Sequence, residues 1–110
     1  MRYDVNTATF VKNMWLGYNQ NINGKYKVWS DHIEIRIQYK TILYIYYCFD
    51  RHILLKVIRN KEMIYEEDCY QQYRVVDITQ QYMSPKDSKR MLAIYTNKWQ
   101  LLCHDLENLV

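Results

Sequence analysis

Residues 33–49, which read IEIRIQYKTILYIYYCF, decide the fold. In residues 33–39, isoleucine or tyrosine alternates with glutamate, arginine and glutamine, and this period of two predicts a half-buried strand. Lys40-Thr41 offers a short turn, and residues 42–49 are apolar on both faces, which is typical of a central strand. We therefore expect residues 33–49 to form a hairpin inside an antiparallel sheet.

Further strands extend the sheet beyond this hairpin. The additional strands are expected at residues 25–30, 52–59 and 63–65. The connecting turns are expected at Ser30-Asp31, Lys40-Thr41, Asp50-Arg51 and Asn60-Lys61. Residues 73–79, YRVVDIT, are expected to add another strand, although Val75, Val76 and Ile78 also fit a helical period.

A helix is expected before the sheet. Its apolar residues recur at helical spacing at Phe10, Val11, Met14, Trp15 and Tyr18. Asn6 or Thr7 is expected to cap its start. Residues 21–24, NING, are expected to end it, with Gly24 in a positive-φ conformation.

A second helix is expected after the sheet, and its start is clearly marked. Ser84 is a capping residue, Pro85 suits the first helical position and Asp87 places an acid in the first turn. Its apolar side recurs at Met91, Leu92, Tyr95, Trp99, Leu102, Leu106 and Leu109. The sequence thus predicts an α+β fold with an N-terminal helix, an antiparallel β-meander of four to six strands and a C-terminal amphipathic helix.

Length and composition point to one folded unit. The 110 residues are expected to form a single compact α+β domain over residues 1–110. Hydrophobic residues make up 49% and charged residues 25%, which is normal for a globular chain. No apolar run approaches the roughly 20 residues that span a membrane, and no apolar segment of a signal peptide follows Arg2. The three cysteines are widely spaced, which favours a reducing compartment, so we expect a cytoplasmic protein with no membrane contact.

Few residues carry the pattern of a catalytic or metal site. Cys48 and His52 flank a turn and are considered as a nucleophile and its base, but no orienting group accompanies them. The remaining cysteines and histidines are Cys69, Cys103, His104 and His32, and none has the paired spacing of zinc ligands. The acidic run at residues 66–68 is expected to be a solvated turn. With only two glycines a phosphate-binding loop is excluded, so we expect no enzyme activity, no cofactor and no metal.

The turns fix which residues share a face of the sheet. One face is almost entirely apolar and is expected to be the core; it carries Ile33, Ile35, Ile37, Tyr39, Ile42, Tyr44, Tyr46, Cys48, Ile53, Leu55, Val57 and Ile64. The opposite face carries Glu34, Arg36, Gln38, Leu43, Ile45, Tyr47, Phe49, His52, Leu54, Lys56, Ile58, Met63 and Tyr65. That second face is too apolar for a freely solvated surface.

Three explanations compete for the second face. One helix covers each face of the sheet, or the second face forms a homodimer, or it binds a different macromolecule. If it binds a partner, aromatic and arginine side chains are the expected anchors. The candidate partner-binding residues are Arg36, Leu43, Ile45, Tyr47, Phe49, Leu54, Lys56 and Ile58.

The chain resembles no particular family by motif, but it resembles a broad class in size and composition. Glycine (2) and proline (1) are scarce and tyrosine (12) is abundant, as in AT-rich coding sequences. Small phage and mobile-element proteins of this kind act by binding a host protein, and anti-CRISPR and other anti-defence inhibitors belong to them. The resemblance implies a non-enzymatic inhibitor in the host cytoplasm that binds a host protein or a nucleoprotein complex.

The alternative function is binding of single-stranded nucleic acid on the sheet. Basic residues are interleaved with aromatic ones at Lys25, Tyr26, Lys27 and Trp29, and strand-borne tyrosines stack on bases in proteins of that type. The net charge of +3 is spread along the chain, which gives only a weak electrostatic footprint for a nucleic acid. A protein partner is therefore the first expectation.

Overall fold

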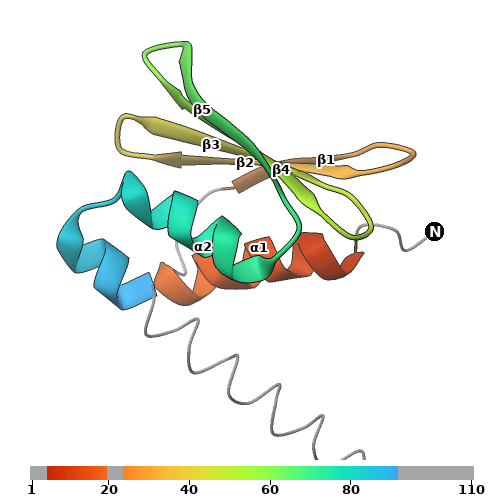
Figure 1. Cartoon of the computed structure of the whole chain (residues 1–110), viewed down its shortest axis with the longest axis horizontal. Coiled ribbons are helices and arrows are strands. Elements are labelled where there is room, and N and C mark those ends of the chain that lie inside the picture. The colour runs from red at the N-terminus through yellow and green to blue at the C-terminus, as the bar shows by residue number, and fades with distance from the viewer. Residues whose placement is uncertain (1–4, 20–23, 92–110) are drawn as a thin grey trace, which may run out of the picture.

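The computed structural model describes residues 5–19 and 24–91. Within these residues, the chain forms helix α1 (Val5–Tyr18), five strands and helix α2 (Gln72–Gln81), followed by helical residues 85–91. The sheet and the helices make two layers (Figure 1). The expected α+β class is confirmed.

The sheet is an antiparallel meander of five strands, in which spatial order equals chain order. Its strands are β1 (Gly24–Val28), β2 (Ile33–Tyr39), β3 (Ile42–Cys48), β4 (Ile53–Arg59) and β5 (Glu62–Cys69). All of the expected turns are present. Lys40, Asn60 and Lys61 adopt positive φ angles of 51°, 54° and 65°. Backbone hydrogen bonds close the other two turns, from Trp29 N–H to His32 C=O at 2.8 Å and from Phe49 N–H to His52 C=O at 2.9 Å.

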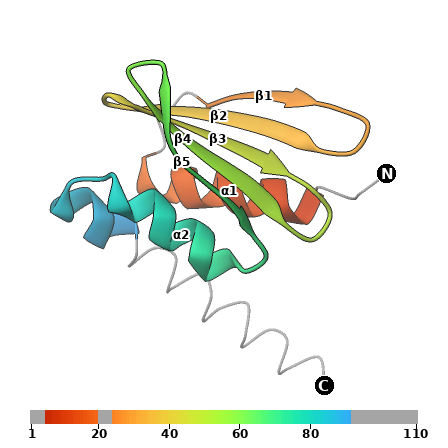
Figure 2. The same ribbon diagram turned by 45° about the horizontal axis from the view of Figure 1, so that its top comes forward.

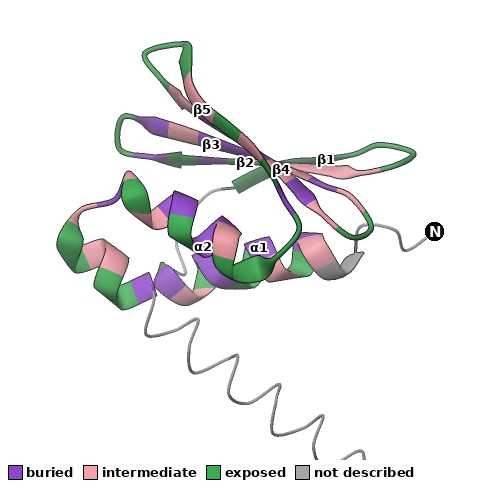
Figure 3. Cartoon of the chain, in the orientation of Figure 1, coloured by how far each residue is buried: buried purple, intermediate pink, exposed green. Residues whose placement is uncertain are grey.

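Both α1 and α2 lie on one side of the sheet, as two views of the chain show (Figure 2). The buried residues of α1 and α2 form one core with those of the strands between the two layers (Figure 3). Most of the expected core face is confirmed: Ile35, Ile37, Tyr39, Ile42, Tyr44, Tyr46, Cys48, Ile53, Leu55 and Val57 are all buried. Ile33 and Ile64 pack against this core and are partly buried.

Hydrogen bonds between buried polar groups join the two layers. The Trp15 indole N–H of α1 donates to the Tyr46 hydroxyl of β3 at 3.0 Å. The Tyr46 hydroxyl is also hydrogen-bonded to the Thr79 hydroxyl of α2 at 2.8 Å. Beside it, the Tyr44 hydroxyl donates to the Thr79 carbonyl at 2.6 Å. These bonds give the buried tyrosine hydroxyls hydrogen-bond partners in place of the water that they lose on folding.

The strand expected at residues 73–79 is wrong, because these residues belong to α2. The buried residues of α2 are Val75, Val76, Ile78 and Thr79, while Asp77 is exposed. This pattern follows the helical period, and the helix covers core residues that a further strand at the sheet edge would leave in water.

Two expectations for α1 are also wrong. Asn6 and Thr7 lie within the helix rather than at its cap, and the Thr7 hydroxyl donates to the Phe49 carbonyl at 2.6 Å instead. Gly24 begins β1 and has no positive φ. A β-carbon at Gly24 would lie 2.8 Å from Ile37 Cδ1, so close approach of β1 to that side chain accounts for the glycine.

The cap at Ser84 is confirmed. The Ser84 hydroxyl accepts the backbone N–H of Asp87 at 3.3 Å, and residues 85–91 are helical. The Asp87 carboxylate accepts the Tyr39 hydroxyl at 2.5 Å, which fastens this turn to β2. The expected apolar side of the last helix beyond Met91 lies outside the described residues. Across the parts of the chain that are described, no helix is long and apolar enough to cross a membrane.

Candidate interaction surface

The side of the sheet away from α1 and α2 is covered by no element in residues 5–19 and 24–91 (Figure 2). We call this side the open face. The strand registers arrange its side chains in three rows across the sheet. The rows are Lys27–Glu34–Tyr47–Leu54–Asp68, Lys25–Arg36–Ile45–Lys56–Glu66 and Gln38–Leu43–Ile58–Met63.

All the candidate partner-binding residues lie on or beside the open face. Phe49 follows β3 at its end, and the other candidates are in the three rows. The explanation that one helix covers each face of the sheet is therefore wrong for the described residues, because α1 and α2 lie on the same side. Tyr65 was expected here, but a register shift between Val57 and Ile58 pairs it with Val57, and it packs against the core.

Charged side chains cover the centre of the open face. Ile45 is only 3% exposed although no helix lies above it. Its row neighbours are Arg36 and Lys56, whose long stems shield apolar surface. Ile45 is thus buried within the open face, and the side chains of Arg36 and Lys56 lie between it and the solvent.

Ion pairs hold these covering residues in place. Arg36 Nε lies 2.7 Å from a Glu34 carboxylate oxygen, and this hydrogen bond raises the pKa of Arg36. Lys56 Nζ lies 3.9 Å from Glu66 and 5.2 Å from the centre of the Tyr47 ring. Arg36 and Lys56 therefore each already have an intramolecular carboxylate partner.

The apolar part of the open face is most accessible toward β5. Leu43, Leu54 and Ile58 are partly buried, and Met63 on β5 is 51% exposed. Leu43, Ile58 and Met63 form a continuous strip across β3, β4 and β5, since the register places Leu43 opposite Ile58 and Ile58 opposite Met63. Leu54 lies apart from this strip, in the row of Tyr47 and Asp68. Such a strip beside charged residues has the composition of a contact surface.

A line of stacked rings borders the open face at one end. We call it the aromatic row; it consists of Trp29, His32, Phe49, His52 and Tyr70. Successive ring centres lie 5.9, 5.0, 4.8 and 5.1 Å apart. The row joins the β1–β2 turn, the β3–β4 turn and the segment after β5.

Neighbouring rings in the aromatic row stack on one another, so each inner ring has a neighbour against both of its faces. Phe49 lies between His32 and His52, and its ring is inclined by only 6° to that of His52. Carboxylates fix the imidazoles, with His32 Nδ1 2.7 Å from Asp31 and His52 Nδ1 2.6 Å from Asp68. The inner rings consequently present their edges rather than their faces to an incoming group.

Sequence reasoning missed the aromatic row as a unit. Its members come from three separate connections, and only the closed turns bring them together. A signal is nevertheless present, because an aromatic residue and a histidine flank each of two turns: Trp29 and His32 flank one, and Phe49 and His52 flank the other.

The considered nucleophile and base do not form a pair. Cys48 is fully buried on the core face, opposite Ile53. His52 precedes Ile53 and lies in the aromatic row with Asp68 as its partner. The two side chains thus lie on different faces of the sheet, and the structure contradicts the hypothesis that they act together.

The acidic run at residues 66–68 lies within β5 rather than in a solvated turn. Its carboxylates alternate between the faces, with Glu66 near Lys56, Glu67 bonded to Arg74 and Asp68 bonded to His52. Among the described residues, no group of three or more His, Cys, Asp or Glu side chains is placed to hold a metal ion. Cys103 and His104 lie outside those residues.

Comparison with known proteins gives no assignment. No protein-family model, no curated protein and no solved structure matches the chain. The chemistry of its surface is therefore the basis for a functional proposal.

Proposed function

We propose that this chain is a non-enzymatic interaction module that binds a partner protein through its open face. The observation that carries the proposal is the uncovered side of the sheet, where Leu43, Ile58 and Met63 form an apolar strip beside the row that holds Arg36 and Lys56. Apolar centres with polar rims are the usual composition of protein interfaces. Tyr47, Phe49 and Arg36 supply the residue types that most often dominate binding energy.

A protein partner fits this surface better than a single-stranded nucleic acid. Bases bind sheets by stacking on free ring faces, whereas His32, Phe49 and His52 stack on one another. Arg36 and Lys56 are paired with carboxylates, so their charge is partly neutralised toward phosphates. The nucleic-acid alternative rests on the basic residues of β1 near Trp29, where Lys27 Nζ lies 4.4 Å from the ring centre.

The proposal extends to the biological setting. Scarce glycine and abundant tyrosine in a chain of 110 residues support a small phage or mobile-element protein. Such a protein would act as an anti-defence inhibitor in the host cytoplasm by covering a surface of a host protein or nucleoprotein complex. The open face is the surface we assign to that contact.

The test is affinity capture from nuclease-treated bacterial lysate with matched variants. Tyr47→Ala and Met63→Glu alter the open face, while Tyr73→Ala alters an exposed tyrosine on α2. We expect the wild type and Tyr73→Ala to retain the same protein and the open-face variants to weaken its binding roughly 30-fold, as for a hot-spot residue of ~2 kcal/mol. Equal retention by all variants, or no captured protein with the wild type, would overturn the proposal.

A further inference from the structure

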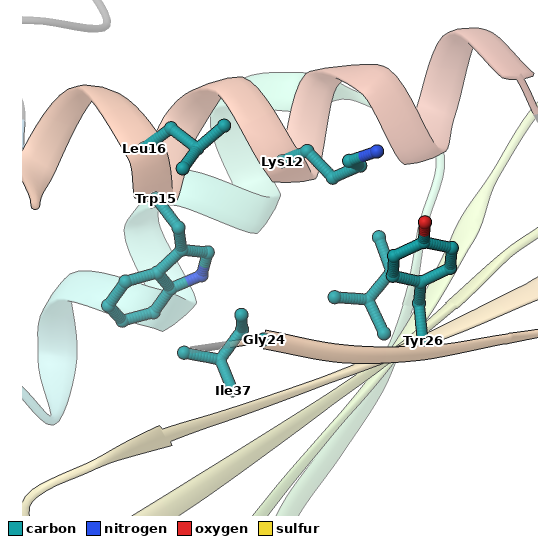
Figure 4. Close-up of a pocket in the computed structure, with 7 residues that line it drawn as sticks. Lys12, Trp15, Leu16, Gly24, Tyr26 and Ile37 are labelled. Carbon is teal, nitrogen blue, oxygen red and sulfur yellow. The ribbon is translucent and has the colours of Figure 1, made fainter. Parts of the chain in front are cut away.

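A groove runs between α1 and β1 on the helix side of the sheet (Figure 4). Its volume is about 130 Å³. Trp15 and Ile37 are buried in its floor, while Leu16 and Tyr26 are 44% and 62% exposed at its rim. Lys12 reaches from α1 to within 4.9 Å of the Tyr26 ring centre. The groove is therefore an apolar hollow that opens beside an edge strand.

The outer edge of β1 carries backbone hydrogen-bonding groups that pair with no strand among the described residues. β1 is the first strand in the sheet order, and no other described strand pairs with its outer side. Trp29 donates its backbone N–H toward β2, and in an antiparallel ladder the residues that bond a given neighbour alternate. Lys25 and Lys27 accordingly bond β2, whereas Gly24, Tyr26 and Val28 direct their N–H and C=O groups outward.

The two faces of β1 differ in chemistry. Lys25 and Lys27 project onto the open face, because they pair with Arg36 and Glu34. Tyr26 and Val28 project onto the helix side, where they are 62% and 64% exposed. A strand added along this edge would meet positive charge on one face and apolar surface on the other.

The lysines of β1 make it unfavourable for a second copy of the chain to pair with this edge. In a symmetric antiparallel pair of β1 strands, each lysine would face a lysine of the other copy, and like charges directly opposite one another are destabilising. An acidic strand would be stabilised at this edge, since its carboxylates would face the positive charges of Lys25 and Lys27.

We propose that the outer edge of β1 binds an extended segment of the partner protein in which acidic and apolar side chains alternate. The segment hydrogen-bonds to the backbone of Gly24, Tyr26 and Val28. Its carboxylates lie against Lys25 and Lys27, and its apolar side chains lie against Tyr26, Val28 and the groove. This inference rests on the proposed function, because it gives the chemistry of one segment of the partner.

The test uses the full chain and a short synthetic peptide in which Glu and Val alternate. We expect binding that weakens as salt rises, with NMR shifts concentrated at the amides of Gly24, Tyr26 and Val28. A peptide in which Lys and Val alternate should bind at least about tenfold more weakly. Equal binding of the two peptides, or no binding of the Glu peptide, would overturn the inference.

Two variants separate the charge contribution from the backbone contribution. Lys25→Glu/Lys27→Glu should reverse the preference between the peptides without altering the backbone. Val28→Pro removes an outward N–H and leaves the β1–β2 bonds in place, so it should weaken the Glu peptide about tenfold. Unchanged binding by both variants would contradict edge pairing, as would amide shifts at β1 that appear on concentrating the chain alone.

The open-face variant Tyr47→Ala distinguishes this inference from the proposed function. It should bind the Glu peptide like the wild type, because Tyr47 lies on β3, away from the β1 edge. Loss of peptide binding in Lys25→Glu/Lys27→Glu together with intact binding in Tyr47→Ala supports the edge site. Failure of the peptide alongside capture that depends on Tyr47 overturns only the edge site.

Discussion

The Tyr46 hydroxyl lies in the centre of the core, where burial raises the pKa of its phenol far above the usual value. It accepts the Trp15 indole N–H and is bonded to the Thr79 hydroxyl, so one oxygen connects both helices to β3. Tyr46 is fully buried, with 0% of its surface exposed. Removing the oxygen therefore lowers stability mainly because the Trp15 N–H and the Thr79 hydroxyl lose a hydrogen-bond partner.

Tyr46→Phe should lower the free energy of unfolding by about 1–3 kcal/mol, because the buried Trp15 N–H loses its acceptor. Urea denaturation measures the change. Tyr26→Phe is the matched control, since Tyr26 is largely exposed, and it should change stability by less than about 0.5 kcal/mol. Equal urea midpoints for the two variants would contradict this account of the core.

Glu67 carries a pH dependence of stability. Its carboxylate accepts hydrogen bonds from Arg74 and from the Tyr65 hydroxyl, which lower its pKa from 4.5 to about 2. A lowered folded-state pKa stabilises the fold above the unfolded pKa, and this contribution disappears as the pH falls from about 4.5 to about 2. Glu67→Gln should therefore be less stable than the wild type at pH 7.

The stability difference between wild type and Glu67→Gln should shrink as acid protonates Glu67. Urea midpoints measured at several pH values between 7 and 2 follow this change. Glu62→Gln is the control, because Glu62 is an exposed carboxylate on the same strand. A difference that stays constant across this range would show that the Arg74 contact does not depend on the carboxylate charge.

At the scale of elements, the turn between β4 and β5 combines a tight reversal with an unfavourable residue. Asn60 and Lys61 both have positive φ, and lysine is disfavoured in that conformation relative to glycine. Lys61→Gly creates an Asn-Gly turn and should stabilise the fold by about 0.5–1 kcal/mol. The temperature midpoint of thermal unfolding measures this gain in stability. Lys61→Val is the control: valine is β-branched and should lower the midpoint. A higher midpoint for Lys61→Val than for Lys61→Gly would contradict the assigned turn geometry.

The strands were predictable because their signals are local. Alternation in residues 33–39 and the paired turn residues fix both the strands and their register. The helix α2 was not, since Val75, Val76 and Ile78 satisfy both periods and the sheet edge decides between them only after folding. Gly24 was misassigned for a related reason: its role depends on Ile37, which is distant in sequence.

At the scale of the whole molecule, the two-layer core protects two thiols. Cys48 and Cys69 are 0% and 2% exposed, and burial raises the pKa of Cys69 to about 11. In a Cys103→Ser background, both should react with a thiol reagent on the order of a thousandfold more slowly than in denaturant, because exposure requires unfolding. Rapid labelling of either thiol in the folded protein would contradict the packing of α2 on the sheet.

The open face was predictable as a set of residues, but its accessibility was not. Register assigns Ile45 to that face, yet only the placement of Arg36 and Lys56 shows that it is covered. The aromatic row forms only when the strands pair in register, because its rings come from two turns and the segment after β5. Reasoning from the sequence therefore identified which residues share this side of the sheet, but it did not reach the arrangement of their side chains.

The meander order has a consequence for how the chain acquires its structure. Each strand pairs with its immediate neighbour in sequence, so every step of sheet growth closes a short loop. Short loops close rapidly, which allows strands to pair one after another as a ribosome releases them. The Trp15–Tyr46–Thr79 bonds span the chain and must wait for α2. During synthesis, α2 would therefore close over a sheet that had been pairing its strands since the first hairpin emerged.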